Sequence, residues 1–144
     1  MKNLTLIIPA KNEAESLPKF LEELTNLEAK KLVILEKNDI ETINSIKDYR
    51  NIKIIYQISK GYGNAIIEGI NNSETEYSCI INADGSMDPK YLREMLTECS
   101  SNNFVFASRY EKNSSSDDDT IITLIGNYIL LYFLLVFYQQ FIPL

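Results

Sequence analysis

Short apolar runs recur along the chain, and most are shorter than a typical buried helix. Their content of Ile, Val and Leu is typical of buried strands. The predicted strands cover residues 3–9, 31–36, 51–57, 77–83 and 103–108. Between them, apolar residues recur three or four positions apart, which is a helical spacing. The predicted helices cover residues 15–27, 39–49, 61–73 and 89–99. This alternation predicts an α/β fold with an open, mostly parallel sheet and helices on both faces, of the Rossmann-like kind.

The segments that follow the predicted strands are polar and hold most of the candidate chemistry. In open parallel sheets, ligands bind beyond the carboxyl ends of the strands. Those ends carry the sequences PAKNE (9–13), EKND (36–39), SKGYGN (59–64), NADGSMD (82–88) and SRYEK (108–112). We therefore expect one binding site along this edge of the sheet.

Two polar residues predict where helices begin. Asn12 is followed three residues later by Glu15, a capping-box pattern that predicts Asn12 as an N-cap. Asp88 precedes Pro89. Since proline is favoured at the first helical position, Asp88 is the predicted N-cap of the helix that follows.

The composition narrows the class of partner. The 144 residues amount to about one domain, with a formal net charge of -6 and no histidine. An acidic chain is poorly suited to bind a nucleic-acid polymer. The lack of histidine excludes His-based triads, His metal sites and His general bases. Cys79 and Cys99 form no CxxC pair, and we expect reduced thiols in a cytosolic setting.

Asn82, Asp84 and Ser86 form an oxygen-rich cluster where the fourth predicted strand ends. Carboxylate, amide and hydroxyl oxygens suit Mg²⁺ or Mn²⁺, and such ions complete their shell with water and substrate phosphates. These three residues are the candidate metal ligands. The alternative for Asp84 is turn formation with Gly85. For Asp88, helix capping is favoured over a role at a site.

Four further residues could bind a phosphorylated ligand. Gly61 and Gly63 follow the third predicted strand. Glycine lets backbone N–H groups approach a phosphate closely, although an ordinary tight turn is the alternative. Glu13 could accept hydrogen bonds from ribose hydroxyls, or it could start the first helix. Arg109 could clamp an anionic group, or it could be a surface arginine.

Residues 120–144 contain no charged side chain and are predicted to form an apolar helix. About 20 uncharged residues suffice to span a bilayer. Three interpretations stay open: a helix on the membrane surface, a membrane span, and a core or oligomer helix. Membrane contact is favoured. The sequence thus predicts an α/β nucleotide-sugar-binding domain at 1–119 and, at 120–144, a membrane-associated or truncated acceptor-side segment.

Four segments, taken in order, resemble the nucleotide-binding half of the family 2 glycosyltransferases. They are LIIPAKNEAESL (6–17), GYGNAIIEGI (61–70), NADGSMDPKYL (82–92) and FASRY (106–110), and the resemblance covers residues 4–127. The branch that the chain resembles most is the polyprenyl-phosphate or dolichyl-phosphate hexose synthases. The resemblance implies a GT-A fold, a nucleotide diphosphate sugar as the donor, and Mg²⁺ or Mn²⁺ as the cofactor.

The resemblance implies that five residues surround the nucleotide. Pro9, Ala10 and Glu13 match the first-strand segment that lines the base and the ribose. Gly61 and Gly63 match the glycine turn beside the nucleotide.

The resemblance also implies which residues meet the metal and the phosphates. Asn82 and Asp84 match the two acidic positions of the DxD motif, which holds a divalent ion against the diphosphate, and Ser86 matches a further polar position of that site. Arg109 matches an arginine that meets donor or acceptor phosphate, so Asp84 and Arg109 are the expected catalytic residues. In this branch the acceptor phosphate is already ionised, so a site without histidine is compatible with the reaction.

The chain departs from the family pattern at the second strand and at the DxD motif. The family has two adjacent acids after the second strand, and one of them binds and recognises the nucleobase. Here the pair is Glu36 and Lys37, which leaves Glu36 as the candidate base-binding residue. Asn82 replaces the first acid of DxD, which should weaken metal binding. The second arginine that the family has beyond SRY is missing, and we expect the chain to be truncated relative to that family.

The expected function is metal-assisted transfer of a hexose to a polyprenyl phosphate or another lipid-linked acceptor, at the cytoplasmic face of the cell membrane. The C-terminal helix could also mediate oligomers. One alternative is a catalytically silent relative that serves as a membrane-bound binding module. Another is a dinucleotide-dependent oxidoreductase, which is disfavoured because GxG follows the third strand rather than the first.

Overall fold

The computed structural model describes residues 2–99 and 104–107, with Gly126 and Ile129 beyond them. The chain divides into two compact units, Met1–Ser100 and Ser101–Leu144. The first unit holds the strands and helices named below.

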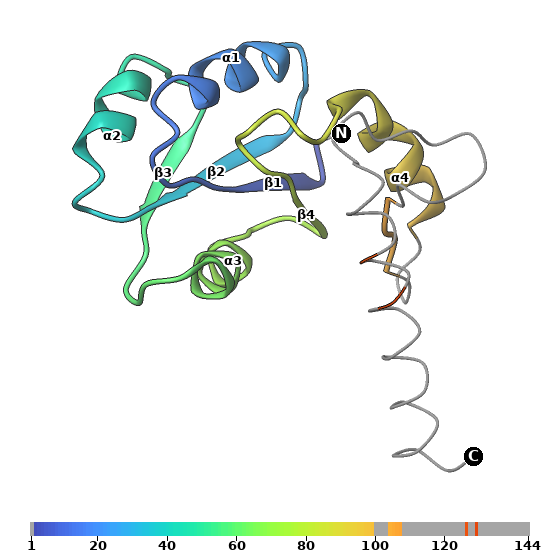
Figure 1. Ribbon diagram of the computed structural model, residues 1–144. Coiled ribbons are helices and arrows are strands. Elements are labelled where there is room, and N and C mark those ends of the chain that lie inside the picture. Colours follow the sequence, from blue (N-terminus) through green and yellow to red (C-terminus); the bar gives the residue numbers. More distant parts are fainter. Residues whose placement is uncertain (1, 100–103, 108–125, 127–128, 130–144) are drawn as a thin grey trace. The chain divides into compact units, whose positions relative to one another are not determined.

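Four parallel strands form the sheet of the first unit (Figure 1). They are β1 (Leu4–Pro9), β2 (Lys30–Leu35), β3 (Lys53–Tyr56) and β4 (Tyr77–Ile80), in the order β3-β2-β1-β4. The helices are α1 (Ser16–Glu23), α2 (Ile40–Ile46), α3 (Tyr62–Asn71) and α4 (Leu92–Glu98), the last preceded by a 3-10 turn (Pro89–Tyr91). The first four predicted strands, the four predicted helices and the parallel α/β fold are confirmed.

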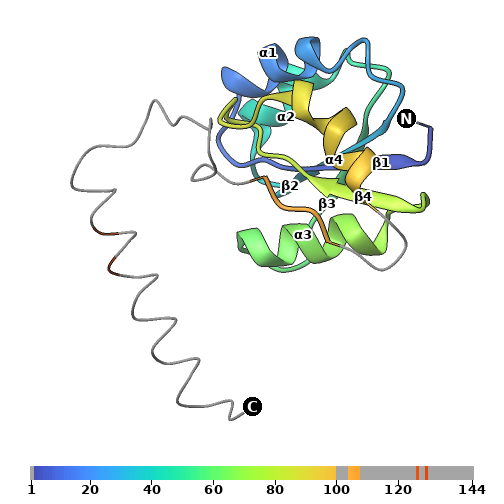
Figure 2. The same cartoon turned by 90° about the vertical axis from the view of Figure 1, so that its right-hand side faces the viewer.

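Helices cover both faces of the sheet, with α1 and α2 on one face and α3 on the other (Figures 1 and 2). Successive residues of a strand point to opposite faces, so β1 contributes to two cores. Ile8 belongs to the core with Leu17 and Phe20 of α1, whereas Ile7 belongs to the core with Ala65 of α3. Each large apolar side chain buried in this way stabilises the fold by about 1.5–3 kcal/mol.

Gly69 sets the distance between α3 and the sheet. A Cβ atom at this position would lie 2.2 Å from Cγ2 of Ile7 on β1. Such a distance is far inside van der Waals contact, so only glycine lets the helix approach this closely.

The loops that follow the four strands begin at one edge of the sheet. Three backbone hydrogen bonds of 3.0 Å continue the ladders past the strand ends: Ala10 N–H to Ile34 O, Gln57 N–H to Leu35 O, and Ile81 N–H to Ile7 O. The polar segments at the strand ends thus begin at one edge of the sheet, as predicted.

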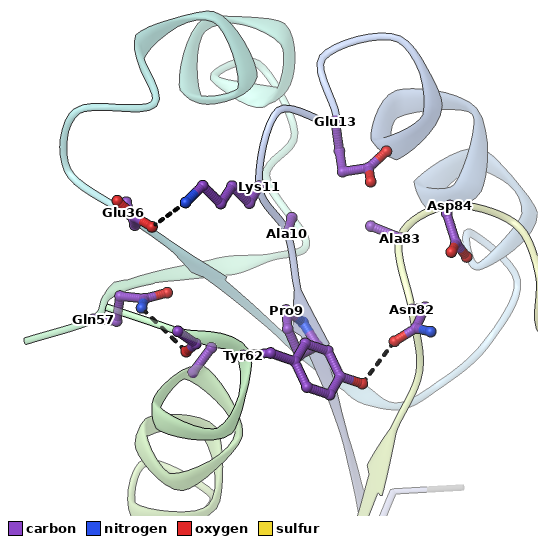
Figure 3. A pocket seen from close by; sticks show the side chains of 12 residues that line it. Pro9, Ala10, Lys11, Glu13, Glu36, Gln57, Tyr62, Asn82, Ala83 and Asp84 are labelled. Atoms are coloured by element: carbon purple, nitrogen blue, oxygen red, sulfur yellow. Dashed lines mark hydrogen bonds and ion pairs between the residues drawn. The ribbon is translucent and has the colours of Figure 1, made fainter. Parts of the chain in front are cut away.

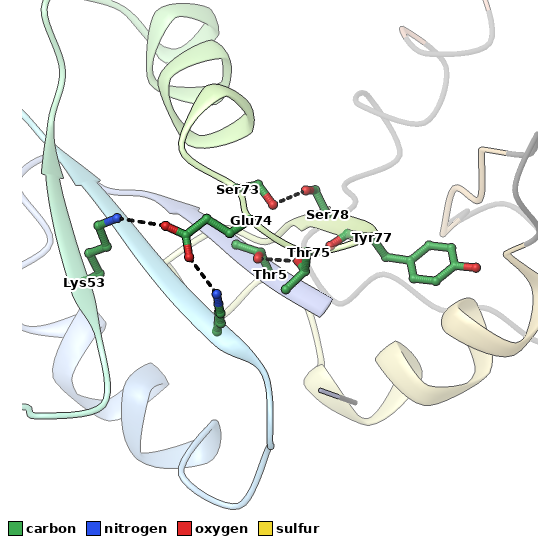
Figure 4. Close-up of polar contacts among 8 residues, drawn as sticks. Thr5, Lys53, Ser73, Glu74, Thr75, Tyr77 and Ser78 are labelled. Atoms are coloured by element: carbon green, nitrogen blue, oxygen red, sulfur yellow. Dashed lines mark hydrogen bonds and ion pairs between the residues drawn. The ribbon is translucent and has the colours of Figure 1, made fainter. Parts of the chain in front are cut away.

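Polar contacts connect the strands at the opposite edge (Figure 4). Glu74, which precedes β4, forms ion pairs with Lys30 of β2 at 2.7 Å and with Lys53 of β3 at 3.8 Å. The hydrogen bond from Lys30 and the two positive charges lower the pKa of Glu74. The hydroxyl groups of Thr5 and Thr75 lie 2.5 Å apart and connect β1 to the same segment. Ion pairs and a hydroxyl contact therefore connect the strands at the edge where they begin, opposite the loops that follow their carboxyl ends.

The predicted fifth strand is wrong where the structure describes it. Residues 104–107 form no strand, and Phe104 and Phe106 are 89% and 85% exposed. The continuous apolar run of residues 104–107 and its β-branched and aromatic residues are typical of a strand, but β propensity depends on a neighbouring strand and a face to bury. Residues 103 and 108 of this segment lie outside the described part.

Asn12 does not cap the first helix. α1 begins at Ser16 after Glu15, whose side chain makes no capping hydrogen bond. Asn12 has a φ of 58°, in the left-handed region that asparagine tolerates. Its N–H donates to Oδ2 of Asp39 at 2.8 Å. A tertiary contact to the loop before α2 thus replaces the predicted local cap.

Most of the predicted C-terminal helix lies outside the described residues. Gly126 and Ile129, the two residues of it that are described, are helical. Within the described part of the chain, no helix has both the length and the apolarity to cross a bilayer. The residues around position 119 are also outside the description, so the division into 1–119 and 120–144 stays a prediction.

Candidate functional site

A pocket of about 240 Å³ opens at the carboxyl edge of the sheet (Figure 3). Its lining comes from the loops after all four strands and from the start of α3. The lining residues are Pro9, Ala10, Lys11, Glu13, Glu36, Gln57, Gly61, Tyr62, Ala65, Asn82, Ala83 and Asp84. The site therefore lies where ligands of open parallel sheets bind.

The pocket brings together most of the residues that the sequence singled out. Those that line it are Pro9, Ala10, Glu13, Glu36, Gly61, Asn82 and Asp84. Gly63 and Ser86 are near neighbours in the sequence but are not part of the lining. Arg109 lies outside the described residues.

Small apolar residues form one part of the lining. Ala10 follows β1, Ala65 is on α3 and Ala83 follows β4, and they are 7%, 3% and 2% exposed. Pro9 ends β1 beside them. Short side chains leave space for a flat group, and their apolar surface suits the faces of a ring. This part of the pocket can hold a nucleobase or a ribose.

Glu36 is the buried carboxylate of the pocket. Its side chain is 9% exposed, and its Oε1 lies 2.9 Å from Nζ of Lys11. Burial of a charge is costly unless the charge is paired, and Lys11 supplies the opposite charge. The Lys11 side chain is 65% exposed, so it can move into solvent with little loss of packing. Glu36 would then be able to accept an N–H group of a base. Lys37 does not line the pocket.

Asp39 and Thr42 hold the loop that carries Glu13. One carboxylate oxygen of Asp39 accepts the N–H of Asn12, and the other accepts the N–H of Thr42 at 3.3 Å, which caps α2. Thr42 is buried, and its hydroxyl accepts the N–H of Glu13 at 3.0 Å. The carboxylate of Glu13 accepts a hydrogen bond from the hydroxyl of Ser16, the first residue of α1. Glu13 therefore contacts the start of the helix and lines the pocket as well.

Gly61 turns the chain from β3 into α3. Its φ is 108°, which glycine adopts without strain. Gln57 stabilises this turn, because its Nε2 donates to the carbonyl oxygens of Ser59 at 2.6 Å and Gly61 at 3.4 Å. α3 begins at Tyr62, so its first turn borders the pocket. The N-terminus of a helix carries a partial positive charge that favours anionic groups.

Asn82 and Asp84 both accept hydrogen bonds through a side-chain oxygen, Asn82 from another loop and Asp84 within its own turn. The hydroxyl of Tyr62 donates to Oδ1 of Asn82 at 2.8 Å (Figure 3). Oδ1 of Asp84 accepts the N–H of Ser86 at 2.9 Å. Turn formation, the alternative for Asp84, is thus present, and the same residue also lines the pocket.

Asp88 caps the 3-10 turn that leads into α4. Its side chain accepts the N–H of Lys90 at 2.9 Å, which confirms the predicted cap. Hydrogen bonds from the side chain and backbone of Lys90 lower the pKa of this carboxyl. Asp88 is therefore a structural residue and does not line the pocket.

Acidic residues outnumber basic ones in the lining, with Glu13, Glu36 and Asp84 against Lys11. A phosphorylated ligand would therefore need a further positive charge. Among the described residues, no group of three or more His, Cys, Asp or Glu side chains could hold a metal ion. Asp84 fits an ion that takes most of its ligands from water and substrate phosphates. An ion held here would have to take most of its ligands from water and substrate.

The sequence alone did not single out Lys11, Gln57 or Tyr62. All three lie in or next to the polar segments at the strand ends, which is the signal that could have found them. Their roles come from partners in other loops: Lys11 pairs with Glu36, and Tyr62 with Asn82. The tertiary fold, rather than local spacing, decides those partners.

The sequence matches the family described as glycosyl transferase family 2 over residues 5–142. It is 26% identical over 95 residues to the uncharacterized glycosyltransferase Rv0539 of Mycobacterium tuberculosis, an alignment that covers 66% of this chain and 43% of that protein. It is 28% identical over 113 residues to the poly(ribitol-phosphate) beta-N-acetylglucosaminyltransferase TarP of Staphylococcus aureus, covering 72% of this chain and 35% of that protein. The chain therefore spans less than half the length of these curated relatives.

Proposed function

Because this chain belongs to glycosyl transferase family 2, we propose that it transfers a hexose from a nucleotide diphosphate sugar to a membrane-linked acceptor such as a polyprenyl phosphate. The observation that carries the proposal is the pocket at the carboxyl edge of the sheet. It gathers the carboxylates of Glu36 and Asp84, the glycine turn at Gly61 and the amide of Asn82.

Each part of the donor has a suitable group in the pocket. The base would lie on the alanine-rich lining, where Glu36 can accept an N–H group once Lys11 moves aside. The ribose hydroxyls would donate to Glu13. The diphosphate would lie between Gly61 and the segment that carries Asn82 and Asp84. Backbone N–H groups at the start of α3 favour this anion.

The proposed reaction needs no base to remove a proton. An ionised oxygen of the acceptor phosphate forms a bond to the anomeric carbon, and the bond from that carbon to the diphosphate breaks. The products are the glycosylated lipid phosphate and a nucleoside diphosphate, which leaves with the electron pair of the broken bond. The chain would orient the two reactants and stabilise the leaving charge.

Mg²⁺ or Mn²⁺ is the proposed cofactor, and a bound ion would neutralise charge on the departing diphosphate. Asp84 is the residue we propose to hold it, with Ser86 beside it in the same turn. The excess of carboxylates in the lining supports the need for a cation. Arg109 is the second proposed source of positive charge.

The proposed acceptor is a lipid because residues 120–144 carry no charge. On this basis we place the protein at the cytoplasmic face of the cell membrane, where its C-terminal segment could also mediate oligomers. The Staphylococcus aureus relative is named for transfer to poly(ribitol-phosphate), so that polymer is the second acceptor to compare.

Transfer of a radiolabelled hexose tests the function directly. The full chain is incubated with uridine and guanosine diphosphate hexoses and vesicles that contain a polyprenyl phosphate, in Mn²⁺. We expect labelled lipid from the wild type and from Asp48→Ala, an exposed acid outside the pocket, and none from Asp84→Ala. A parallel reaction with poly(ribitol-phosphate) distinguishes the two acceptors.

A catalytically silent binding module is the second candidate, because Asn82 replaces an acid of the DxD pattern. This function predicts nucleotide-sugar binding without transfer to any acceptor. Labelled lipid that depends on Asp84 would exclude it.

A further inference from the structure

The hydrogen bond between Tyr62 and Asn82 fixes the direction of an amide inside the pocket. Tyr62 is the first residue of α3, and Asn82 follows β4. The Tyr62 hydroxyl donates to Oδ1 of Asn82 at 2.8 Å, across 20 residues of sequence. Figure 3 shows Asn82 with its oxygen toward Tyr62 and its nitrogen on the other side. The carbonyl oxygen of the amide therefore already accepts a hydrogen bond within the protein.

The amide nitrogen of Asn82 is an available donor. An asparagine amide has two N–H groups, and Nδ2 makes no hydrogen bond to any residue in the described part of the chain. Asn82 is half-buried and lines the pocket. Every fully buried side-chain nitrogen and oxygen atom among the described residues has a partner, so Nδ2 is accessible to a ligand. A group that accepts hydrogen bonds is the natural occupant of this position.

The charge of the pocket favours an amide over a carboxylate at this position. Glu13, Glu36 and Asp84 already outnumber Lys11 in the lining. A fourth carboxylate would repel an anionic ligand unless a metal ion neutralised it. A neutral amide adds no such repulsion, and its N–H groups can donate to phosphate oxygens, which are strong acceptors.

We propose that Asn82 binds the diphosphate of the nucleotide through Nδ2 and does not serve as a metal ligand. Tyr62 is a positioning residue that holds the amide in this orientation. Part of the affinity for the nucleotide is then independent of a divalent ion. This inference rests on the proposed function and assigns Asn82 a role different from the one expected from the DxD pattern.

Calorimetry with uridine and guanosine diphosphates tests this assignment in two buffers, one with EDTA and one with Mn²⁺. The wild type is expected to bind one of them in EDTA. Asn82→Asp keeps the shape of the side chain but replaces a donor by a charge, so binding in EDTA should weaken by about tenfold or more. Mn²⁺ should restore most of that loss, because a carboxylate is a metal ligand.

Tyr62→Phe removes only the hydroxyl that orients the amide. In EDTA it should weaken binding by about threefold, a smaller effect than that of Asn82→Asp, since the amide keeps its donors but loses its fixed direction. Tyr91→Phe is the matched control, because Tyr91 is exposed and does not line the pocket. Circular dichroism and thermal unfolding of each variant test whether the fold is retained.

Two results overturn the assignment. One is wild-type binding that occurs only with Mn²⁺, and the other is an Asn82→Asp variant that binds as tightly as the wild type in EDTA. Each leaves the proposed function intact, since a nucleotide still binds. A wild type that binds no nucleotide in either buffer overturns the proposed function and this inference together.

Discussion

The carboxylate of Asp39 accepts a hydrogen bond from the backbone N–H of Asn12 at 2.8 Å, across 27 residues of sequence. Its other oxygen accepts the N–H of Thr42. One side chain thus caps α2 and holds the β1–α1 loop, which places Glu13 in the lining of the pocket.

Asp39→Ala should therefore affect both the fold and the site. Loss of a cap and of a second backbone acceptor should lower the free energy of unfolding by about 1–2 kcal/mol. Nucleotide affinity should also fall, because the loop that carries Glu13 is released. Urea unfolding followed by circular dichroism measures the first effect and calorimetry the second. Asp48→Ala is the control, and equal stability of the two variants would contradict this role of Asp39.

The two glycines of the turn after β3 should respond differently to alanine. Gly61 has φ 108° and ψ 152°, a backbone region that is essentially restricted to glycine, so an alanine there should cost about 1–3 kcal/mol. Gly63 lies within α3, and a Cβ atom added there would have open space around it. Its replacement should be neutral or stabilising by up to about 1 kcal/mol, because alanine favours helix. Thermal unfolding of both variants tests this, and a Gly63→Ala protein less stable than Gly61→Ala would contradict it.

The polar segments show how much of the site could be predicted from the sequence. The alternation of apolar strand runs with helical patterns predicted a parallel sheet whose loops share one edge. Glu13, Glu36, Gly61, Asn82 and Asp84 do line one pocket at that edge. Each follows a strand in the sequence, so the parallel direction of the strands brings it to this edge, while contacts between loops, such as those of Asp39 and Thr42, complete the placement of Glu13.

Partners between loops could not be predicted in the same way. Asn12 looked like a local cap, but its N–H donates to Asp39 on another loop. Tyr62 stood between two glycines, and only the packing of α3 against β1 brings its hydroxyl to Asn82. Phe104 and Phe106 followed a strand pattern without forming a strand, because pattern alone does not supply a neighbour.

The close approach at Gly69 gives a third prediction. In Gly69→Ala, the added methyl group would overlap Cγ2 of Ile7, and relief of that overlap should cost about 1–3 kcal/mol of stability. Ile7→Ala removes the overlapping atoms. The double variant should therefore be more stable than the sum of the two single effects predicts, as a double-mutant cycle of urea unfolding would show. If the effects of the two single substitutions on the free energy of unfolding simply add, the prediction is wrong, and α3 moves away from β1 without strain.

Glu74 gives a prediction about pH. Its pKa is lowered in the folded chain by Lys30 and Lys53, so its contribution is present above the ordinary carboxyl pKa and is lost as the pH falls through the lowered value. Glu74→Gln should be slightly less stable than the wild type at pH 7, and the difference should shrink below the ordinary carboxyl pKa and disappear once Glu74 is protonated in the folded chain. Glu28→Gln, an exposed acid with no ion pair among the described residues, is the control.

High salt, like acid, should reduce the stability difference between Glu74→Gln and the wild type. The ion pairs of Glu74 are exposed, so about 1 M sodium chloride should remove most of the difference between Glu74→Gln and the wild type at pH 7. A difference that persists in acid and in high salt would show that Glu74 acts through packing.

The central claim is that the pocket at the carboxyl edge binds a nucleoside diphosphate. Two-dimensional ¹H–¹⁵N spectra of the full chain, recorded during titration with uridine or guanosine diphosphate in Mg²⁺, test it most directly. We predict shifts of the amide signals of Glu36, Gly61, Asn82 and Asp84, with those of Lys30 and Glu74 at the opposite edge unchanged. Shifts that gather around Lys30 and Glu74, or no shifts with either nucleotide, would contradict the account.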